Sequence, residues 1–562
     1  MSVTIMSLTN DEIVVILMNL SIKDIENFSS TCKRFRQTLW GNKLWMKKCY
    51  ENWPSIKNIY SGLTIDDICK IDFRNQVKEA VKFRKDILSL LSQMSEANLA
   101  DSNKRELVVN FLCATLNSIN YYIAIDELRQ IISQSPRVFG CDLTQRYYSY
   151  HIYRQLKYFH IMHKLLKFMW KTKEQQFLEK MITHLIQWFN VNVDIFNDIS
   201  YSHIKTSLEH LAEKVLQVLK KEDPSHPIFE KSNVFHDHWQ NNNVFYTEWN
   251  HNEILKILTV MEKIVFSPSY FHKLNQLWIK TYENEFNPVI SQGIQSICFL
   301  TIYHSVLRRL GIYSVLILKN TLQIFLKTED FTKLPSEYIC VQLKKSQLCL
   351  ENFIRRDTRD RNHLMINTIL IEYLKEREEN LNIQDKGQLL LLWNILRGNP
   401  ADIIDLMRWD CNLNIKKSEP ERSAELKFVI GTIVTHKCNH YKTHFGVIAG
   451  WHHYFNLNSI KFGISFQTLP DNYSKISCRN VDNCIRSDCL LHKPYYIILC
   501  KNNEYCYVPE DNISICSSTK WINHDEIGRY FSRYKHTYYV PNEMLARNYP
   551  RDIAKINKMT QN

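Results

Sequence analysis

The sequence predicts a multidomain, mainly α protein with a smaller β-containing module at its C-terminal end. Its 562 residues exceed what one compact core usually holds, so several domains are expected. Glycine is scarce, with 12 in the whole chain, which favours helices over turn-rich sheets. Five of these glycines fall in the last quarter, where four short runs of β-branched and aromatic residues are typical of strands: Phe428 to Lys437, Phe445 to His453, Tyr495 to Lys501 and Tyr505 to Ile515. Asn502-Asn503 can turn the last two runs into a hairpin, because asparagine tolerates positive φ.

Residues 8–53 have the pattern of short amphipathic helices that pack tightly together. Thr9 and Glu12 fit a capping box, while Ser21 and Asp24 mark the start of a second helix. The apolar residues that share the first helix face are Ile13, Ile16, Leu17 and Leu20. Local sequence therefore predicts a compact helical unit at the N-terminal end.

This unit resembles the F-box, in which apolar helices are followed by a closing Leu-Trp pair. Thr9 replaces the proline with which the family begins, and threonine is itself a good helix start. The resemblance implies that the unit binds a Skp-type adaptor and, through it, a cullin. The residues expected to contact the adaptor are Leu8, Ile16, Leu17, Leu20, Leu44 and Trp45. The alternative is a generic helical hairpin whose leucines fill only a local core.

The middle of the chain divides into a helical spacer, 65–222, and an α+β domain, 228–400. The breaker-rich segment Asp223-Pro224-Ser225-His226-Pro227 separates them, because proline disfavours helix at the preceding residue. The stretch from Ser296 to Leu318 is the most apolar, but charged side chains interrupt it, which predicts a core helix and not a membrane span. The segments Tyr270 to Leu274 and Pro288 to Ile312 resemble a SirB-like transglutaminase-fold domain.

A working enzyme of that fold needs a cysteine at the start of the core helix and a histidine on a following strand. Those positions hold Gln295 and Gln323, neither of which can do the chemistry. Cys298 lies nearly one helical turn further on and is expected to face the core, and His304 lacks a suitably spaced acid. The sequence thus predicts a domain without catalytic residues.

The C-terminal region, 426–552, resembles the YccV-like or hemimethylated-DNA-binding domain. The residues that carry the resemblance are Gly431, His436, Gly450, Trp451, Gly528, Arg529, Tyr530, Phe531, Pro541 and Asn542. The family name suggests DNA, yet 15 basic residues against 10 acidic ones are scattered through the region. Trp451, Tyr530 and Phe531 could stack on bases, but a small barrel also needs them as core, which we favour. DNA is therefore a possible but not a favoured partner.

Cys478, Cys484, Cys489 and His492 come nearest to a metal-binding cluster, because thiolate and imidazole suit tetrahedral zinc. Their spacing lacks a close Cys-x2-Cys pair, so we expect ordinary thiols in an insertion loop, and no metal or other cofactor. The sixteen cysteines show no paired spacing, and the N-terminal residues do not resemble a secretory signal. Reduced thiols in the cytoplasm or nucleus are expected, with no membrane association.

The four regions follow one another in the order of the F-box only protein 21 family, which the whole chain resembles. That resemblance implies a non-catalytic substrate-recognition subunit of an SCF-type ubiquitin ligase, which binds an unknown target protein through its later domains. Two alternatives remain open. The net charge of +13 permits a DNA- or chromatin-binding factor that acts through the C-terminal module, and the central domain permits a transglutaminase-fold enzyme.

Overall fold

The computed structural model describes most of the chain, with gaps, and divides it into two compact units. The described residues are 5–39, 41–94, 102–138, 140–191, 200–231, 233–244, 246–247, 249–265, 288–318, 322–327, 337–344, 347–354, 426–438, 442–454, 493–501, 503–516 and 520–559. The first unit combines Met1–Leu156 with Arg408–Asn562, and the second is Lys157–Met407. Each unit is considered by itself.

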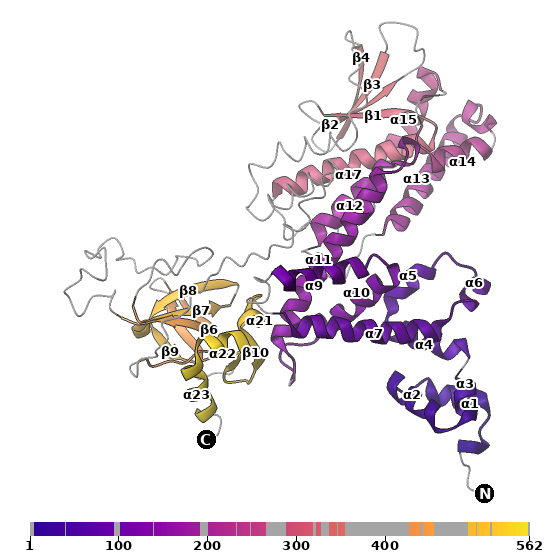
Figure 1. Ribbon diagram of the computed structural model, residues 1–562. Helices are drawn as coiled ribbons and strands as arrows, with labels where there is room; N and C mark the ends of the chain where they lie inside the picture. The colour runs from indigo at the N-terminus through magenta and orange to yellow at the C-terminus, as the bar shows by residue number, and fades with distance from the viewer. Residues whose placement is uncertain are drawn as a thin grey trace, which may run out of the picture. The chain divides into compact units, whose positions relative to one another are not determined.

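The first unit begins with four short helices (Figure 1). They are α1 (Asn10–Leu17), α2 (Ile22–Thr31), α3 (Lys33–Thr38) and α4 (Asn42–Asn52). The predicted capping box is confirmed: the Thr9 hydroxyl accepts from the Glu12 amide, and the Glu12 carboxylate accepts from the Thr9 amide at 2.7 Å. The Ser21 hydroxyl likewise accepts from the Asp24 amide at the start of α2. Local side chains therefore fix both helix starts.

Further helices extend the core of these four into a helical layer. They are α5 (Lys57–Tyr60), α6 (Ile65–Cys69), α7 (Phe73–Ser92), α9 (Ser102–Ala114), α10 (Ser118–Ser133) and α11 (Leu143–Met169), of which α11 continues into the second unit. One cluster of buried side chains runs from Ile13 in α1 to Ile123 in α10. The Trp53 indole donates to the Glu127 carboxylate at 2.8 Å inside this layer. The N-terminal helices are thus anchored to the spacer by shared packing.

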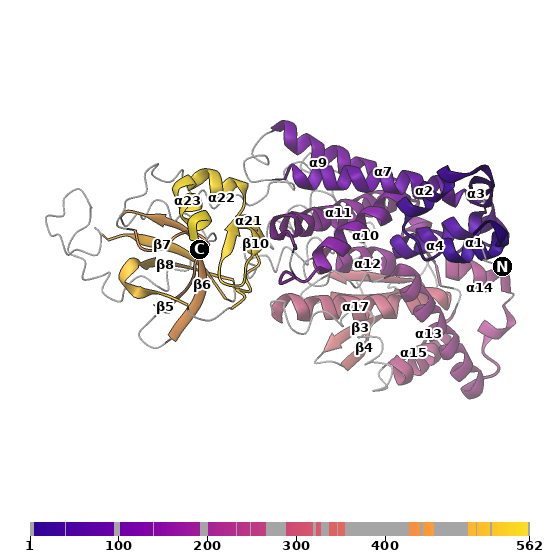
Figure 2. The ribbon, with the colours of Figure 1, turned by 90° about the horizontal axis from the view of Figure 1, so that it is seen from below.

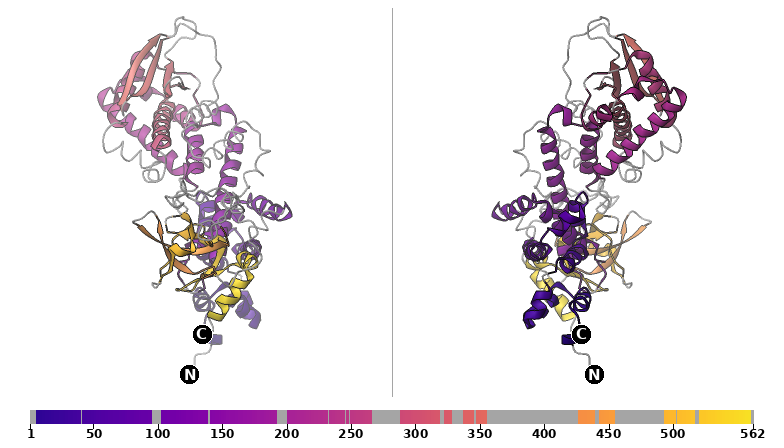
Figure 3. Two further views of the ribbon diagram at one scale, coloured as in Figure 1. Left: turned by 90° about the vertical axis from the view of Figure 1, so that its left-hand side faces the viewer. Right: turned by 90° about the vertical axis from the view of Figure 1, so that its right-hand side faces the viewer.

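The second unit packs helices around α17 and adds a sheet (Figures 1 and 3). Its further helices are α12 (Leu178–Asn190), α13 (Tyr201–Glu222), α14 (Asn233–Asn241), α15 (His251–Val265) and α17 (Pro288–Arg309). The strands β1 (Ser314–Leu318), β2 (Leu322–Lys327), β3 (Glu337–Lys344) and β4 (Gln347–Ile354) form an antiparallel sheet in that order. From Ile297 to Arg309 every side chain except His304 is buried, so α17 is the central helix.

Two boundaries predicted from the sequence, the end of the core helix and the border between the spacer and the α+β domain, differ from the structure. The core helix expected to reach Leu318 ends at Arg309, because Gly311 adopts a positive φ of 73° and packs against the Trp239 ring, and β1 follows. The break at Asp223 does end α13, but α13 packs with α15 and α17 in one core. The spacer region 65–222 is therefore shared between the two compact units, and residues 355–400 of the predicted α+β domain lie outside the described residues.

The C-terminal module of the first unit is a curved antiparallel sheet with helices against it (Figure 2). The sheet has the order β8-β7-β6-β5-β9, and β10 pairs with β11. The strands are β5 (Ile433–Cys438), β6 (Lys442–His452), β7 (Tyr495–Cys500), β8 (Glu504–Pro509), β9 (Ile513–Ile515), β10 (Phe531–Tyr534) and β11 (Tyr539–Pro541). The helices are α21 (Ile527–Tyr530), α22 (Glu543–Asn548) and α23 (Pro550–Met559).

The predicted hairpin between the third and fourth runs is confirmed, since β7 and β8 pair and Asn503 adopts a positive φ of 63°. The fourth run is two strands, because a turn at Glu510–Asn512 separates β8 from β9. The mainly α, multidomain layout with a C-terminal β module is also confirmed. Among the described helices, none alone is long and apolar enough to cross a membrane, and a bent pair, Glu106–Ala114 with Ser118–Ser133, passes that test only when both members are joined.

Candidate functional site

Helix α1 carries two apolar side chains that the N-terminal helices leave exposed. Val15 is 61% exposed and Ile16 is 43% exposed. Leu8 and Leu20 are partly buried against the local core, so they reach both the core and the surface. Exposed apolar groups on a short helix are available to another protein. Of the residues expected to contact an adaptor, Ile16 is the most accessible, and Val15 beside it was missed by the sequence analysis.

Three of the expected contact residues lie inside the core instead. Leu17 and Leu44 are each 1% exposed, and the Trp45 indole donates to the Leu39 carbonyl at 2.7 Å within the same core. A side chain in this position cannot reach a partner while the domain is folded. Burial therefore argues against direct contact by these three residues. The i, i+4 spacing places Leu17 on a shared helix face without showing which part of that face is covered, and Leu44 and Trp45 were expected only from the resemblance to the F-box.

The residues considered for catalysis in the second unit do not form a reactive group. Cys298 is 2% exposed in the middle of α17, and burial raises the pKa of its thiol far above the ordinary range. His304 is partly buried, its Nδ1 lies 2.6 Å from the Ser314 hydroxyl, and burial lowers its pKa to about 4. Gln295 lies in α17, which begins at Pro288, and Gln323 lies in β2. No cysteine contacts His304 among the residues that the structure describes.

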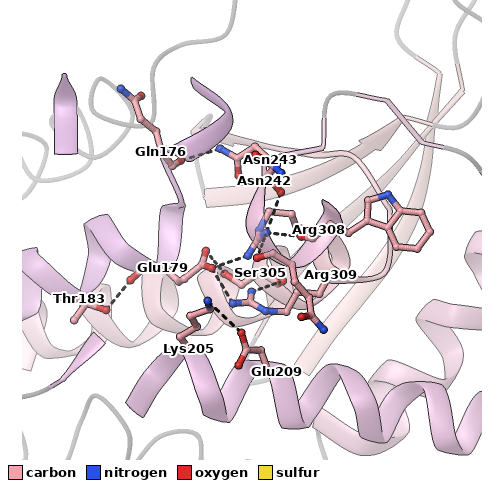
Figure 4. Close-up of polar contacts among 12 residues, drawn as sticks. Gln176, Glu179, Thr183, Lys205, Glu209, Asn242, Asn243, Ser305, Arg308 and Arg309 are labelled. Carbon is pink, nitrogen blue, oxygen red and sulfur yellow. Dashed lines mark hydrogen bonds and ion pairs between the residues drawn. The ribbon is translucent and has the colours of Figure 1, made fainter. Parts of the chain in front are cut away.

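A buried polar cluster of the second unit surrounds Glu179 in α12 (Figure 4). The Glu179 carboxylate is fully buried and accepts from Arg308 at 2.9 Å and from Ser305 at 3.0 Å. Arg309 lies 3.1 Å from the same carboxylate. Arg308 also donates to the carbonyl oxygens of Trp239, Gln240 and Asn242. Two guanidinium groups on consecutive residues of α17 therefore hold one carboxylate of α12.

The cluster holds two guanidinium groups against one carboxylate, so its charges do not cancel. Burial by itself raises the pKa of Glu179, yet the guanidinium groups of Arg308 and Arg309 outweigh it and bring the pKa down to about 2. The carboxylate has no exposed face. The arrangement ties α12, α14 and α17 together and is structural, because it leaves Glu179 no open approach for a substrate.

Most family-signature residues of the C-terminal module serve its packing. Gly431 has a φ of +83°, and a Cβ there would lie 2.1 Å from the Tyr539 carbonyl oxygen. The buried Trp451 indole donates to the Asp552 carboxylate at 3.1 Å, which also accepts from the Ile430 amide. Gly450 similarly lets the Tyr549 hydroxyl approach to 3.0 Å of where its Cβ would be. The expectation that Trp451 belongs to the core is confirmed.

The second part of the signature joins the module to helix α11. Thr144 in α11 donates to the Phe531 carbonyl at 3.1 Å, and Leu143 lies against Gly528. Arg529 is buried and pairs with Glu526 at 2.9 Å. Asn542, which follows Pro541, donates to the Arg529 carbonyl at 2.7 Å and caps α22. Tyr530 and Phe531 are also buried, as expected for core aromatics. These residues position the module, and the buried rings of Tyr530 and Phe531 have no exposed face for a base.

A group of three possible metal ligands, which the sequence analysis missed, lies inside the module. His436, Cys500 and Cys506 come from β5, β7 and β8, and their ligand atoms all lie within 4.8 Å of one another. All three side chains are buried. Their separations in the sequence follow no familiar motif, so only the strand pairing could have revealed them. Cys478, Cys484, Cys489 and His492 lie outside the described residues.

Comparison with known families assigns both ends of the chain. Residues 5–47 match the F-box domain, and residues 426–538 match the family described as hemimethylated DNA-binding protein YccV like. The chain therefore contains an F-box and a YccV-like domain, as predicted. The matched ranges cover α1 to α3, α4 as far as residue 47, and the strands β5 to β10.

Individual proteins match along the chain as well. F-box only protein 21 of Pongo abelii is 21% identical over 621 aligned positions, which cover 98% of this chain and 92% of that protein. F-box only protein 21 of Homo sapiens is 25% identical, and that of Mus musculus 24%, over 159 residues. These two matches cover 28% of this chain and 22% of each relative. No solved structure matches, so the likeness of the second unit to a transglutaminase fold stays a prediction.

Proposed function

We propose that the protein is the substrate-recognition subunit of an SCF-type ubiquitin ligase. The F-box binds a Skp-type adaptor and through it a cullin, while the later domains capture a protein to be ubiquitinated. The protein itself supplies no catalytic group, and ubiquitin is transferred by other subunits of the ligase. The similarity to F-box only protein 21 over 98% of the chain supports this proposal.

The single observation that carries the adaptor contact is the exposed apolar pair on α1. Val15 and Ile16 are 61% and 43% exposed, and two adjacent aliphatic side chains open to solvent give a partner protein an apolar surface to cover. The neighbouring Leu17 is buried and holds α1 against the core, so the exposed pair sits on a fixed support. Rigid apolar anchors of this kind provide much of the binding energy at protein interfaces.

The packing of α4 supports a second feature of the proposal, a firm connection between the F-box and the rest of its unit. The Trp53 indole donates to the buried Glu127 of α10, and the Ser55 amide and hydroxyl donate to Asp126 at 2.8 Å and 2.6 Å. A receptor subunit must present its target at a defined place relative to the adaptor. Polar contacts from the residues just after α4 to α10 limit the motion of the F-box against the helical layer.

We also propose that the central domain has no catalytic activity. Cys298 is enclosed by apolar side chains of α17 and its neighbours, and the buried Glu179 carboxylate accepts from Ser305 and Arg308. Buried cysteines are inert because the thiolate is the reactive form and burial disfavours it. We infer that the second unit serves as a binding scaffold.

Reconstitution tests the proposal. The full chain is coexpressed with a Skp-type adaptor and an N-terminal cullin fragment, and the complex is isolated by size-exclusion chromatography. The expected result is a stable ternary complex that is lost in the double variant Val15→Asp, Ile16→Asp, while this variant still elutes as a folded monomer, because both side chains are exposed. A chain that never copurifies with the adaptor, or a double variant that stays in the complex, would contradict the proposal.

A further inference from the structure

The buried His436, Cys500 and Cys506 side chains converge in the interior of the C-terminal sheet. Strand order places β6 between β5 and β7, so His436 and Cys500 are not on neighbouring strands. Even so, His436 Nε2 lies 3.1 Å from Cys500 Sγ. Cys506 lies on β8, whose pairing with β7 sets Cys500 opposite Glu504. Because side chains alternate along a strand, Cys506 shares the face of Cys500.

Gly446 in β6 makes this meeting possible. It pairs with Val434 of β5 on one side and with Cys500 of β7 on the other. A Cβ at this position would lie 3.3 Å from Cys500 Sγ and 2.3 Å from Ile498 Cγ2. The missing side chain lets the imidazole of His436 reach across β6 to the thiol. Three soft or borderline ligand groups are thus gathered where a small β module normally keeps only apolar side chains.

We propose that His436, Cys500 and Cys506 bind one zinc ion that ties β5, β7 and β8 together inside the C-terminal module. Zinc takes sulfur at about 2.3 Å and imidazole nitrogen at about 2.0–2.1 Å, so ligand atoms around it lie roughly 3.5–3.8 Å apart. The three ligand atoms here already lie within 4.8 Å of one another, and small side-chain rotations close the remaining difference. A water molecule can provide the fourth ligand of a tetrahedral ion.

The charge of the three ligand groups favours a divalent ion. Two thiolates and a neutral imidazole carry a charge of minus two, which a divalent ion cancels fully, whereas a monovalent copper ion leaves one negative charge. His436, Cys500 and Cys506 are 1%, 0% and 3% exposed, so an uncompensated charge among them would lack solvation by water. Burial also keeps other ligands and chelators away from the ion. The site is therefore structural, and it acts independently of the adaptor contact at the other end of the chain.

Metal content of the purified full chain, measured by inductively coupled plasma mass spectrometry, tests the proposal. The expected result is about one zinc per chain, because a site built in the folded module loads during folding. The variants Cys500→Ser and Cys506→Ser are expected to lose this zinc. Two matched controls are expected to keep it: Cys516→Ser, which removes a thiol of the same module outside the cluster, and the triple change Cys478→Ser, Cys484→Ser and Cys489→Ser. Zinc that is absent from the unmodified chain, or lost only in the triple variant, would overturn the proposal.

Cobalt substitution provides a readout that does not depend on whether a cluster variant folds. The triple variant, with all three proposed ligands intact, is refolded or expressed with Co²⁺ and its absorption spectrum is recorded. Two thiolates and an imidazole are expected to give intense sulfur-to-cobalt charge-transfer bands together with the visible bands of tetrahedral cobalt. A spectrum with only the weak bands of octahedral cobalt, which binds oxygen ligands, would contradict a thiolate site and overturn the proposal.

Discussion

The backbone of Gly528 lies directly against that of Leu143, so that a Cβ atom at position 528 would come within 2.1 Å of the Leu143 carbonyl oxygen. Tyr147, one turn further along α11, would be 2.6 Å from the same atom. Residues nearly four hundred positions apart in the sequence thus meet without room for a methyl group. The close approach explains why glycine stands at the start of the signature that continues through Phe531, since this signature is the surface that holds α11.

Gly528→Ala is expected to loosen this contact. The methyl group must displace backbone atoms of α11, and overpacking of this kind lowers the free energy of unfolding by about 1–3 kcal/mol. Hydrogen exchange should rise in the amides of 527–534 and of the first turns of α11. Gly62→Ala is the matched control, because nothing lies within 4 Å of its Cβ position. Equal thermal midpoints for the two variants would show that Gly528 is not under steric constraint.

Glu179→Gln is expected to destabilise the second unit strongly. The change removes the only carboxylate that the described residues provide to the buried Arg308 and Arg309. Breaking a buried pair in this way costs about 3–5 kcal/mol, because the remaining charges lack compensation. Lys263→Ala, which breaks an exposed ion pair with Glu222, is the control and should cost below about 1 kcal/mol. Chemical denaturation of both variants provides the comparison.

The same carboxylate predicts a pH dependence. The pKa of Glu179 is about 2 in the folded protein and about 4.3 in an unfolded chain. A folded-state pKa below the unfolded one contributes stability that is complete above about pH 5 and is lost as the pH falls toward 2. The free energy of unfolding should therefore fall less steeply below about pH 5 in Glu179→Gln than in the unmodified chain. An equally steep fall in both proteins would mean that Glu179 is not the group whose protonation weakens the unit.

Cys298 is expected to resist alkylation in the native protein. It is buried in α17 and burial raises the pKa of its thiol, so almost no thiolate is present for reaction. Cys69 and Cys113 are exposed and serve as internal controls that should be labelled by iodoacetamide within the same sample. Peptide mass spectrometry reports all three sites. Native labelling of Cys298 at the rate of the exposed thiols would instead favour an enzyme.

Duplex DNA is expected to bind weakly and without regard to methylation. Trp451, Tyr530 and Phe531 of the YccV-like module are 2%, 1% and 0% exposed, so none can stack on a base. Residual attraction from the net charge of +13 should disappear at physiological salt. Fluorescence anisotropy with hemimethylated and unmethylated duplexes measures this. Tight binding that persists at high salt and prefers the hemimethylated duplex would favour a DNA reader.

Sequence predicted the features that depend on neighbouring residues. The Thr9 and Glu12 capping box and the turn at Asn503 are local, and their side-chain and backbone requirements can be read from a few positions. The Glu179 and Arg308 pair spans 129 positions, and no periodicity links α12 to α17. The cluster around His436 depends on strand order and on Gly446, which the strand pattern alone does not give.

Within α1, the apolar pattern of the sequence does not distinguish buried residues from exposed ones. Leu17 and Ile16 both belong to the apolar pattern of α1, yet Leu17 is covered by the core and Ile16 is exposed. Replacing Leu17 by Asp would unfold the helix bundle and lower adaptor binding for a reason unrelated to contact. A test of the interface must therefore change only exposed positions.

Binding of a Skp-type adaptor by the double variant Val15→Asp, Ile16→Asp tests the central claim most directly. Both side chains are exposed, so the variant should keep the circular dichroism and thermal midpoint of the unmodified chain. Charges placed in an apolar interface should weaken binding by at least about 2 kcal/mol, or roughly thirtyfold, as measured by calorimetry. The exposed change Leu63→Asp, outside α1, should leave the affinity unaltered and is the matched control. An unmodified chain that does not bind the adaptor, or a double variant that binds with unchanged affinity, would contradict the account.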